Sequence, residues 1–282
     1  MRDCVPLEPS FRFTTDSFAG SDRASLIVVP LPPTHEVLLR PTGNVQTFLW
    51  GMGRPSRAVR RPAAPPAPSA QIELFRLEEG LYAQEEAAWA RGLRVAGVDE
   101  AGRGPLAGPV VAGAVILDPA RPVDGLRDSK LCTPRQRWRL ARAIRGQALG
   151  WAISGVGPRR IDSVNILEAT WRAMRQALGR LALTPGLVLV DGRLRVPGVA
   201  WPQRAIVKGD RRTASIAAAS ILAKVARDAY MVRADRLYPG YGFRIHKGYA
   251  TRAHLDALVR LGPCPLHRRS FRGVPAVLDP DR

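Results

Sequence analysis

Four acidic residues stand where short apolar segments end, a position from which carboxylates can hold a metal ion. Asp99 and Glu100 close the segment LRVAGVDE. Asp191 closes LVLVDG, and Asp210 comes shortly after the apolar stretch AIV. Carboxylate oxygens are the hard ligands that Mg²⁺ and Mn²⁺ take in octahedral sites. The set therefore favours a divalent-metal site, although any one of these acids taken alone could cap a strand or pair with an arginine.

Two questions about this set stay open at the level of sequence. Asp228, in AKVARDAY, competes with Asp210 for the fourth position, but it lies inside an expected helix where neighbouring arginines offer ordinary ion pairs. Asp99 and Glu100 are adjacent, and neighbouring residues of a strand point to opposite faces of the sheet. They can share one site only if the strand ends or bulges there.

A glycine-rich connection follows these acids directly. Gly102, Gly104 and Ala107 in GRGPLAGPV fit the loose G-x-G-x-x-G/A pattern of a dinucleotide-binding fold. That pattern needs a helix to begin at the glycines, whereas Pro105 and Pro109 intervene and a β-type apolar run comes next. A tight connection between two strands, with bare backbone that a ligand can approach closely, fits the residues better.

The charge balance points to a polyanionic partner. The chain of 282 residues has 43 Lys and Arg against 24 Asp and Glu, a formal net charge of +19, and most of the excess lies after residue 70. Such a domain usually meets nucleic acid, because neutralised phosphates release condensed counterions. No apolar run reaches about 18 residues and the first residues lack a secretory pattern. Three widely spaced cysteines imply no disulfide framework, so we expect a cytoplasmic protein.

The periodicity of apolar side chains predicts the elements that must position these residues. Helices are expected over 71–92, 133–150, 161–181, 214–239 and 251–262, and strands over 93–99, 109–117, 150–157 and 186–192. Thr133, Pro134 and Gln136 have the spacing of a capped helix start with a capping box. The order predicts an α/β fold, a mixed sheet flanked by helices with an antiparallel part and a helical C-terminal portion.

Residues 1–70 differ from the rest of the chain. They show no sustained helical or strand period and end in the Pro/Ala/Arg tract RPSRAVRRPAAPPAPSA, which cannot build a core. We expect a disordered N-terminal extension, or sequence upstream of the true start codon. Residues 25–33 could form a short strand, which Pro30 interrupts. Residues 71–282 are expected to form the folded domain.

Six motifs, in order, resemble bacterial ribonuclease HII: GVDEAGRGPLAGPV, RDSKL, LVDG, VKGD, SIAAASILAKVARD and HKGYATRAHLDAL with GPCPLHRRSF. The resemblance covers roughly residues 72–273. It implies an RNase H-like catalytic domain whose C-terminal helices help bind substrate. It further implies cleavage of RNA in RNA–DNA hybrids and at single ribonucleotides in duplex DNA, leaving 3′-OH and 5′-phosphate ends. Asp99, Glu100, Asp191 and Asp210 would correspond to the family's metal-site carboxylates, which hold two Mg²⁺ or Mn²⁺ ions.

The same resemblance implies substrate-contacting positions. Gly102, Arg103 and Gly104 match a loop whose backbone contacts the ribose 2′-OH, the group that distinguishes RNA from DNA. Tyr249 matches a tyrosine that stacks on the sugar of the following deoxynucleotide. Lys130 is expected to hold a phosphate near the metal ions. The implied role is removal of misincorporated ribonucleotides from DNA by a monomer with no obligate protein partner.

Three further basic residues are ambiguous. His254, Arg268 and Arg269 could contact the nucleic-acid backbone or be solvated charges, and the sequence does not decide between these.

Two alternative functions explain fewer of these residues. The related type HIII enzymes share the chemistry but carry a folded N-terminal substrate-binding domain, which the irregular first 70 residues do not suggest. A non-catalytic basic nucleic-acid-binding protein would explain the charge. It would not explain carboxylates set in a basic surface, where they repel phosphate unless metal ions bridge them.

Overall fold

The computed structural model describes residues 13–15, 25–28 and 80–275. These residues build a mixed sheet in the order β1-β2-β5-β4-β3-β6-β7. The strands are β1 (Phe13–Thr15), β2 (Ser25–Val28), β3 (Val95–Ala101), β4 (Val110–Ile116), β5 (Gly150–Val156), β6 (Leu187–Asp191) and β7 (Gln203–Ile206). Strands β1 to β5 pair antiparallel, whereas β6 pairs in parallel with β3 and β7 in parallel with β6. The predicted mixed sheet with an antiparallel part is confirmed.

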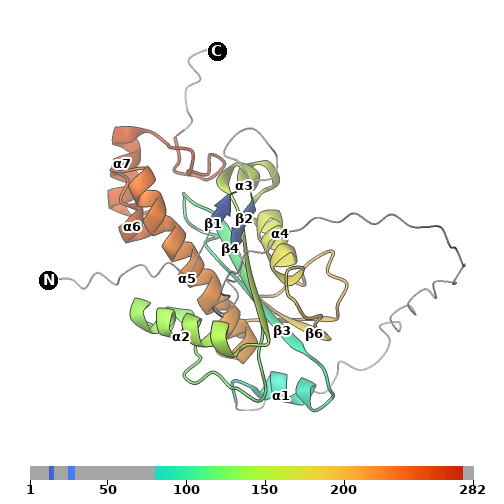
Figure 1. Cartoon of the computed structure of the whole chain (residues 1–282). Coiled ribbons are helices and arrows are strands. Elements are labelled where there is room, and N and C mark those ends of the chain that lie inside the picture. Colours follow the sequence, from blue (N-terminus) through green and yellow to red (C-terminus); the bar gives the residue numbers. More distant parts are fainter. Residues whose placement is uncertain (1–12, 16–24, 29–79, 276–282) are drawn as a thin grey trace, which may run out of the picture. The chain divides into compact units, whose positions relative to one another are not determined.

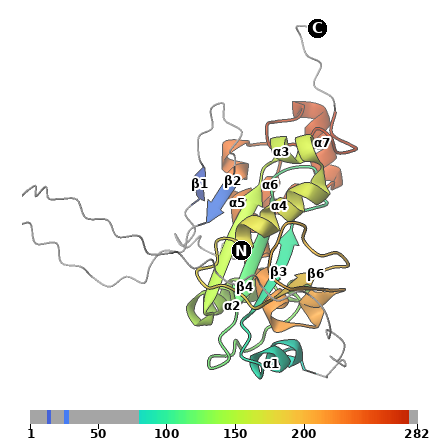
Figure 2. The ribbon, with the colours of Figure 1, turned by 90° about the vertical axis from the view of Figure 1, so that its right-hand side faces the viewer.

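Helices cover both faces of this sheet (Figures 1 and 2). They are α1 (Ala83–Trp89), α2 (Pro134–Gln147), α3 (Pro158–Val164), α4 (Ile166–Leu178), α5 (Ala214–Leu237), α6 (Phe243–His246) and α7 (Arg252–Leu261), with single 3₁₀ turns η1 (Ser129–Leu131) and η2 (Gly209–Arg211). The long α5 crosses one face, with α2 packed against it, and α4 covers the other face. Helices α6 and α7 lie at the far end of α5 and form the helical C-terminal portion that the sequence predicts (Figure 1).

Helix α5 lies unusually close to β3, and one glycine makes this possible. A Cβ atom on Gly97 would come within 2.1 Å of the backbone carbon of Ser215, so no larger residue fits without moving the helix. Side chains two residues apart on a strand face the same way. Asp99, two residues beyond Gly97, is therefore directed to the same face of the sheet, against α5.

Most of the predicted elements are confirmed, and the helix start at Thr133 is confirmed in detail. The Thr133 hydroxyl accepts the backbone N–H of Gln136, whose side chain in turn accepts the backbone N–H of Thr133. Gly262 closes the last helix, α7, as expected.

Two predicted helices differ from the structure. The helix expected over 161–181 is divided into α3 and α4 at Asn165, whose φ of 70° is left-handed and whose side chain accepts the N–H groups of Leu167 and Glu168. An asparagine in this conformation starts a new helix rather than continuing an old one. The helix expected over 71–92 begins only at Ala83 among the described residues, because the chain bends at Gly80 and turns at 81–82.

The expected N-terminal extension falls mainly outside the described residues. Two segments of it are described: Ser25–Val28 is a strand, within the range suggested for one, and pairs antiparallel with β5, while Phe13–Thr15 pairs with Ser25–Val28. For the remainder of residues 1–70, and for the domain boundary near residue 70, the prediction stays a prediction.

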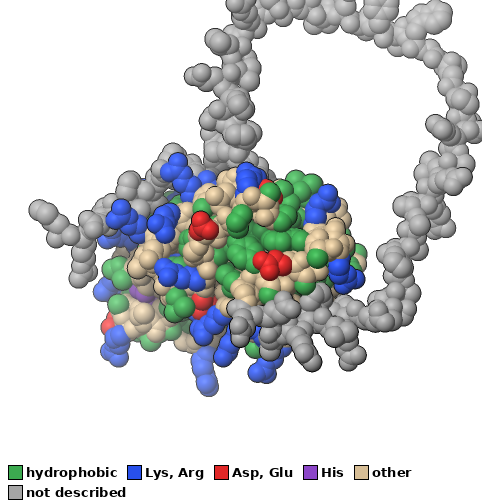
Figure 3. Space-filling view, turned by 90° about the horizontal axis from the view of Figure 1, so that it is seen from below, with side chains coloured by type: hydrophobic (Ala, Val, Ile, Leu, Met, Phe, Trp, Pro, Cys, Tyr) green, Lys and Arg blue, Asp and Glu red, His purple; other side chains and the backbone are tan. Residues whose placement is uncertain are grey.

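Lys and Arg side chains are distributed over the surface of the described part that Figure 3 shows. In the view from the side of α1, Lys and Arg side chains are spread over the visible rim, and Asp and Glu are sparser (Figure 3). Within residues 80–275, no helix combines the length and the apolar composition needed to cross a bilayer.

Candidate active site

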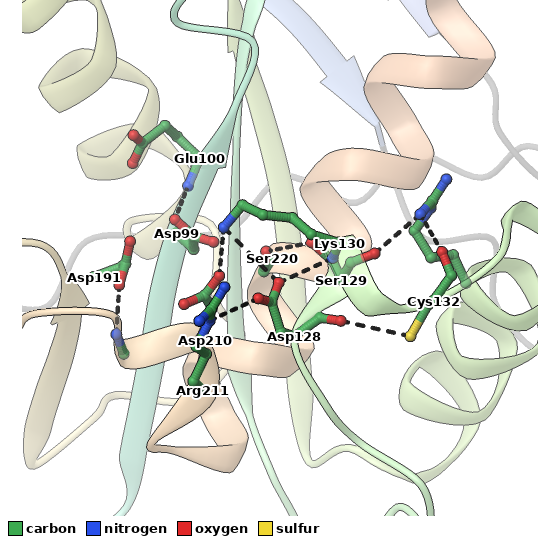
Figure 4. A network of polar contacts seen from close by, with 12 residues as sticks. Asp99, Glu100, Asp128, Ser129, Lys130, Cys132, Asp191, Asp210, Arg211 and Ser220 are labelled. Carbon is green, nitrogen blue, oxygen red and sulfur yellow. Dashed lines mark hydrogen bonds and ion pairs between the residues drawn. The ribbon is translucent and has the colours of Figure 1, made fainter.

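The four predicted carboxylates meet where the pairing between β3 and β6 ends. The last pair of this parallel ladder is Val98↔Val190, so Asp99 and Asp191 stand one residue beyond it on neighbouring strands. Strand β3 continues beside β4 without a bulge, with Asp99 opposite Gly113 and Glu100 opposite Ala112. The Asp99 and Glu100 side chains accordingly leave the strand in different directions (Figure 4). The end of the β6 pairing, rather than a bulge, is what gives both of them access to Asp191.

Backbone N–H groups hold two of these carboxylates in place. The N–H of Glu100 donates to Asp99 Oδ1 at 2.7 Å, and the N–H of Gly209 donates to Asp191 Oδ1 at 2.6 Å. The second bond ties η2 to the end of β6 and thereby brings Asp210, the next residue, alongside Asp191 (Figure 4). Three elements, β3, β6 and η2, together position the cluster.

The electrostatics of the carboxylate cluster are unfavourable in the absence of a cation. Burial raises the pKa of Asp99, and the charges of Glu100 and Asp191 raise it further. Burial likewise raises the pKa of Glu100; Arg103, 3.5 Å from its carboxylate, opposes this rise, and Asp191 adds to it. The pKa of Asp191 is raised by burial and by Asp210, against the bond from Gly209. Each of these shifts reports charge that a bound cation would balance.

Lys130 brings a positive charge to this cluster. Its Nζ donates to Asp210 Oδ2 at 2.7 Å and lies 3.8 Å from Asp128 Oδ1. Burial lowers the pKa of Lys130, but the bond to Asp210 and the charges of Asp210, Asp128 and Asp99 outweigh it, so the pKa is raised. The side chain is 72% exposed, so the ammonium is also open to an incoming ligand.

Three polar residues that the sequence analysis missed support this arrangement. Asp128 is 1% exposed and accepts the backbone N–H of Lys130 and Nε of Arg211, both at 2.9 Å. Ser220, on α5, hydrogen-bonds to Asp99 and lies 3.0 Å from the hydroxyl of Ser129. The position of Asp128 at the start of the DSK sequence is a signal that could have indicated a capping role. No spacing in the sequence points to Ser220, which lies in the middle of a helix.

The donor set suits a hard divalent cation, since it consists of carboxylate oxygens alone. The like charges within it raise the pKa of Asp99, and Asp210 already accepts a hydrogen bond from the ammonium of Lys130. In the part of the chain from residue 80 to 275, no three His, Cys, Asp or Glu side chains stand close enough to enclose one ion as they lie. The residues therefore fit Mg²⁺ or Mn²⁺ by chemistry, and side-chain rotation is needed to complete the coordination.

Asp228, the competing candidate, lies apart from this cluster. It forms an (i, i+4) ion pair with Lys224 on α5, at 2.7 Å. The groups whose pKa its charge alters are Arg227 and Lys247. Asp210, by contrast, acts on Asp191. The geometry thus brings Asp210 rather than Asp228 next to Asp191.

The predicted substrate-contacting residues other than Lys130 lie on two loops, the first of which directly follows Asp99 and Glu100. Arg103 and Gly104 are exposed and Gly102 is buried, in the loop that joins β3 to β4. Tyr249 is 45% exposed in the loop between α6 and α7, and this loop touches the first one through a 2.8 Å bond from the N–H of Leu106 to the carbonyl of Gly248. Two loops far apart in the sequence are therefore in contact, and one of them continues the strand that carries Asp99 and Glu100.

Two of the three ambiguous basic residues do not face solvent. His254 and Arg268 are both 0% exposed, so the expectation that they are phosphate contacts or solvated charges is wrong for both. Each hydrogen-bonds instead to the backbone of the two loops just described. Arg269 is exposed, and its backbone N–H donates to Asp162.

Comparison with known proteins supports a single family. Residues 96–274 match the family model described as Ribonuclease HII. The chain is 58% identical over 188 residues to Ribonuclease HII of Nitrosococcus oceani, covering 67% of this chain and 93% of that protein. It is 55% identical over 195 residues to Ribonuclease HII of Moorella thermoacetica, covering 69% and 94%.

Solved structures share the fold. Ribonuclease H2 from Pyrococcus horikoshii OT3 superposes with a TM-score of 0.55 at 28% identity, covering 64% of this chain and 95% of that one. The RNase HII chain of a complex with PCNA from Archaeoglobus fulgidus gives a TM-score of 0.55 at 26% identity, covering 66% and 99%. The expected RNase H-like fold is confirmed.

Proposed function

Because the chain belongs to the ribonuclease HII family, we propose that it is a metal-dependent endonuclease that cleaves RNA in RNA–DNA hybrids and at single ribonucleotides embedded in duplex DNA, leaving 3′-OH and 5′-phosphate ends. The observation that carries this proposal is the convergence of Asp99, Glu100, Asp191 and Asp210 from three elements beside an exposed, glycine-containing loop. Carboxylates placed in so basic a protein repel phosphate unless cations bridge them.

On this proposal, the four carboxylates hold two Mg²⁺ or Mn²⁺ ions, which when bound supply activation of the attacking water and stabilisation of the leaving oxygen. The protein's own contribution is to keep the carboxylates oriented. The N–H groups of Glu100 and Gly209, and the Ser220 hydroxyl, hold the oxygens of Asp99 and Asp191 in fixed directions.

Lys130 is suited to hold a substrate phosphate next to the metal ions. Its raised pKa keeps the ammonium charged at neutral pH, and Asp128 fixes the backbone from which the side chain extends. Moving Nζ from Asp210 to a phosphate would transfer its positive charge from the protein to the substrate and free Asp210 Oδ2 for a metal ion.

The two loops beside the carboxylates would recognise the nucleic acid. The backbone of Gly102, Arg103 and Gly104 would contact the 2′-OH, which only a ribonucleotide offers. Tyr249 would stack on the sugar that follows. We further propose that the enzyme works as a cytoplasmic monomer, whose role is to remove misincorporated ribonucleotides from DNA.

The proposal is tested with a DNA duplex that holds one ribonucleotide, beside an RNA–DNA hybrid and an all-DNA duplex, in Mg²⁺ or Mn²⁺. We expect a single cut at the ribonucleotide, cleavage of the hybrid, no cleavage of DNA, and loss of all cleavage in EDTA. Cleavage of the hybrid alone would keep the nuclease and remove the recognition of single ribonucleotides. Retained binding without any cleavage would leave a basic nucleic-acid-binding protein.

A matched pair of variants tests the choice of the fourth carboxylate. Asp210→Asn should abolish cleavage, and Asp228→Asn, the same change on the outer part of α5, should leave it intact. Isothermal titration with Mn²⁺ should show the same contrast in metal binding. Full activity of Asp210→Asn would overturn the assignment.

A further inference from the structure

Two arginines are completely buried under the loop that follows the carboxylates. Arg227, on α5, and Arg268, beyond α7, are 0% exposed and are among the largest fully buried side chains. Within residues 80–275, no Asp or Glu oxygen lies within 4.0 Å of either guanidinium. Burying an unpaired charge is costly unless hydrogen bonds replace its hydration. The hydrogen-bond acceptors of the two guanidinium groups therefore show which segment of the backbone these side chains hold in place.

All three hydrogen bonds that the Arg268 side chain donates go to carbonyl groups of one loop, residues 102–108. Nη2 donates to the carbonyl of Gly102 at 2.5 Å, Nη1 to the carbonyl of Arg103 at 2.7 Å, and Nε to the carbonyl of Gly108 at 2.9 Å. The planar guanidinium thereby fixes the directions of three carbonyl groups at once, which a single ammonium cannot do.

The direction of these carbonyls determines where the loop's N–H groups point. In a planar trans peptide, the carbonyl of one residue and the N–H of the next point in opposite directions. Because the carbonyls of Gly102 and Arg103 turn inward to Arg268, the N–H groups of Arg103 and Gly104 turn outward. Both residues are exposed, and in the described part of the chain neither N–H donates to another backbone group. The loop thus presents two adjacent free donors on the side where a ligand would lie.

Arg227 supports the same loop from a second direction. Its Nε donates to the carbonyl of Pro109 at 3.0 Å and its Nη2 to the carbonyls of Ala107 and Lys247, at 3.1 and 3.0 Å. A Cβ on Gly102, whose φ is +92°, would come within 2.0 Å of Nε, so this guanidinium requires glycine at that position. Its bond to Lys247 connects this support to the loop that carries Tyr249.

The segment that carries Arg268 is itself fastened to the loop. The Arg268 N–H donates to the carbonyl of Leu106 and the Gly108 N–H to the carbonyl of Leu266, each at 2.8 Å, around an antiparallel bridge between Ala107 and His267. Burial lowers the pKa of Arg268 to about 9, and the charge of Arg227 lowers it as well, so Arg268 remains cationic at neutral pH. Its charge favours the approach of a phosphate-containing ligand to this loop.

We propose that Arg268 is a positioning residue for ribose recognition: it holds the carbonyls of Gly102 and Arg103 inward so that the N–H groups of Arg103 and Gly104 are aimed at the 2′-OH of the substrate. This inference rests on the proposed function. Arg268 does not touch the nucleic acid in this arrangement, and acts through the two peptide groups that do.

The first test compares Arg268→Lys with Arg260→Lys in the full chain. Arg260 is an exposed arginine on α7 that also donates to one carbonyl, that of Gly240, and it serves as the matched control. Arg268→Lys should lower kcat for a duplex with a single ribonucleotide roughly 10- to 100-fold, the loss expected for charge-assisted hydrogen bonds. KM should change little, since most phosphate contacts remain, and Arg260→Lys should leave both unchanged. Added guanidinium salt should partly restore the activity of Arg268→Gly.

The outcomes separate this inference from the proposed function. If the unaltered protein cleaves and Arg268→Lys cleaves with the same kcat, the positioning role is wrong and the nuclease stands. If the unaltered protein cleaves nothing, the proposed function fails by itself.

A second measurement needs no variant at Arg268 and therefore does not depend on its folding. Amide hydrogen exchange of the full-length Asp99→Asn variant is followed with a duplex containing one ribonucleotide and with its all-DNA counterpart. We expect the amides of Arg103 and Gly104 to be protected by the first duplex only. Equal protection by both duplexes, or by neither, would overturn the proposal.

Discussion

Two polar clusters lie on either side of the loop 102–109, and they treat charge in opposite ways. In the carboxylate cluster of Asp99, Glu100, Asp191 and Asp210, like charges adjoin and burial raises the pKa of three members. In the second cluster, formed by Arg227, Arg268, His246, His254 and His267, buried donors meet backbone carbonyls. In the carboxylate cluster, repulsion between like charges is unfavourable and a bound cation would relieve it. In the second cluster, the polar side chains hold the backbone in place.

In the second cluster, the rings of His254 and His267 use every nitrogen in a hydrogen bond, whereas Nη1 of Arg227 has no partner among the described residues. His254 Nδ1 lies 2.9 Å from the carbonyl of Tyr249, which can only accept, so this nitrogen carries the proton. Its Nε2, 3.0 Å from Nε2 of His267, is then the acceptor, and His267 Nδ1 accepts the N–H of Cys264 at 2.9 Å. This assignment leaves both rings neutral, each with one donor and one acceptor in use.

The largest expected effect is a separation of activity from stability in the carboxylate cluster. Asp99→Asn should reduce cleavage by about 10³-fold or more, since a metal ligand supplies several kcal/mol in the transition state. The same change should raise Tm in EDTA, because it removes a buried charge whose raised pKa shows that its ionised form is disfavoured in the folded protein. Cleavage assays and thermal denaturation in EDTA measure the two effects. A fall in Tm would show that this cluster stabilises the fold as the second one does.

The second prediction concerns the second cluster and the pH dependence of the free energy of unfolding that His267 causes. Burial, and then the neighbouring His254, lower the pKa of His267 from 6.5 to about 4 in the folded protein. A lowered pKa means that the folded state binds its proton less readily than the unfolded state does. The stabilisation is therefore complete above pH 6.5 and is lost as the pH falls toward 4, by up to about 3 kcal/mol. Urea denaturation at several pH values checks this.

The control for this pH dependence is His267→Gln, which should show a shallower fall in stability over the same range. The carboxylates with raised pKa act in the opposite direction, since protonation favours their folded form, so the comparison must be made between the two proteins and not within one. An identical pH profile for both would remove His267 as the cause.

A smaller effect is expected when a single bond of the histidine pair is removed. In His254→Asn the amide can still donate to the carbonyl of Tyr249, but the bond to His267 is lost, at a cost of about 1–2 kcal/mol. Thermal denaturation should show this loss while kcat for the ribonucleotide-containing duplex stays unchanged. A large fall in kcat without a fall in Tm would place His254 in the chemistry and end the division between the two clusters.

The smallest effect is expected for a charge outside both clusters. Arg252 pairs with Asp256 on α7 at 2.9 Å, with side chains 90% and 54% exposed. Arg252→Ala should change the free energy of unfolding by less than about 0.5 kcal/mol and leave cleavage unaltered. A change as large as that of His254→Asn would show that exposed charges matter as much as the buried ones.

The parts of the fold that could be predicted are those encoded by neighbouring residues. Asp99 and Asp191 follow apolar segments whose strand character is local, and Thr133 with Gln136 forms its capping box within one turn. Asn165 was missed because the apolar pattern continues across it, and only its left-handed backbone reveals the break.

The parts that could not be predicted depend on contacts between distant segments. Arg268 contacts the carbonyls of Gly102 and Arg103, and Ser220 contacts Asp99, and both separations exceed half the length of the described chain. An arginine in a basic sequence gives no sign that it will be buried without an acidic partner, and a serine within a helix gives none that it will face a carboxylate. The short strand β7 was not predicted for a related reason, because its pairing with β6 rather than its composition defines it.

The fastening of the loop 102–109 by the segment around Arg268 has a consequence for biosynthesis. The ribosome makes the loop and the first two carboxylates early, but the carbonyls of Gly102 and Arg103 find their guanidinium only after α7 and the residues beyond it have been translated. A nascent chain that ends before residue 268 lacks the brace of the proposed ribose-recognition loop. The proposed ribose-recognition loop is therefore braced only after Arg268 has been translated, long after the loop itself.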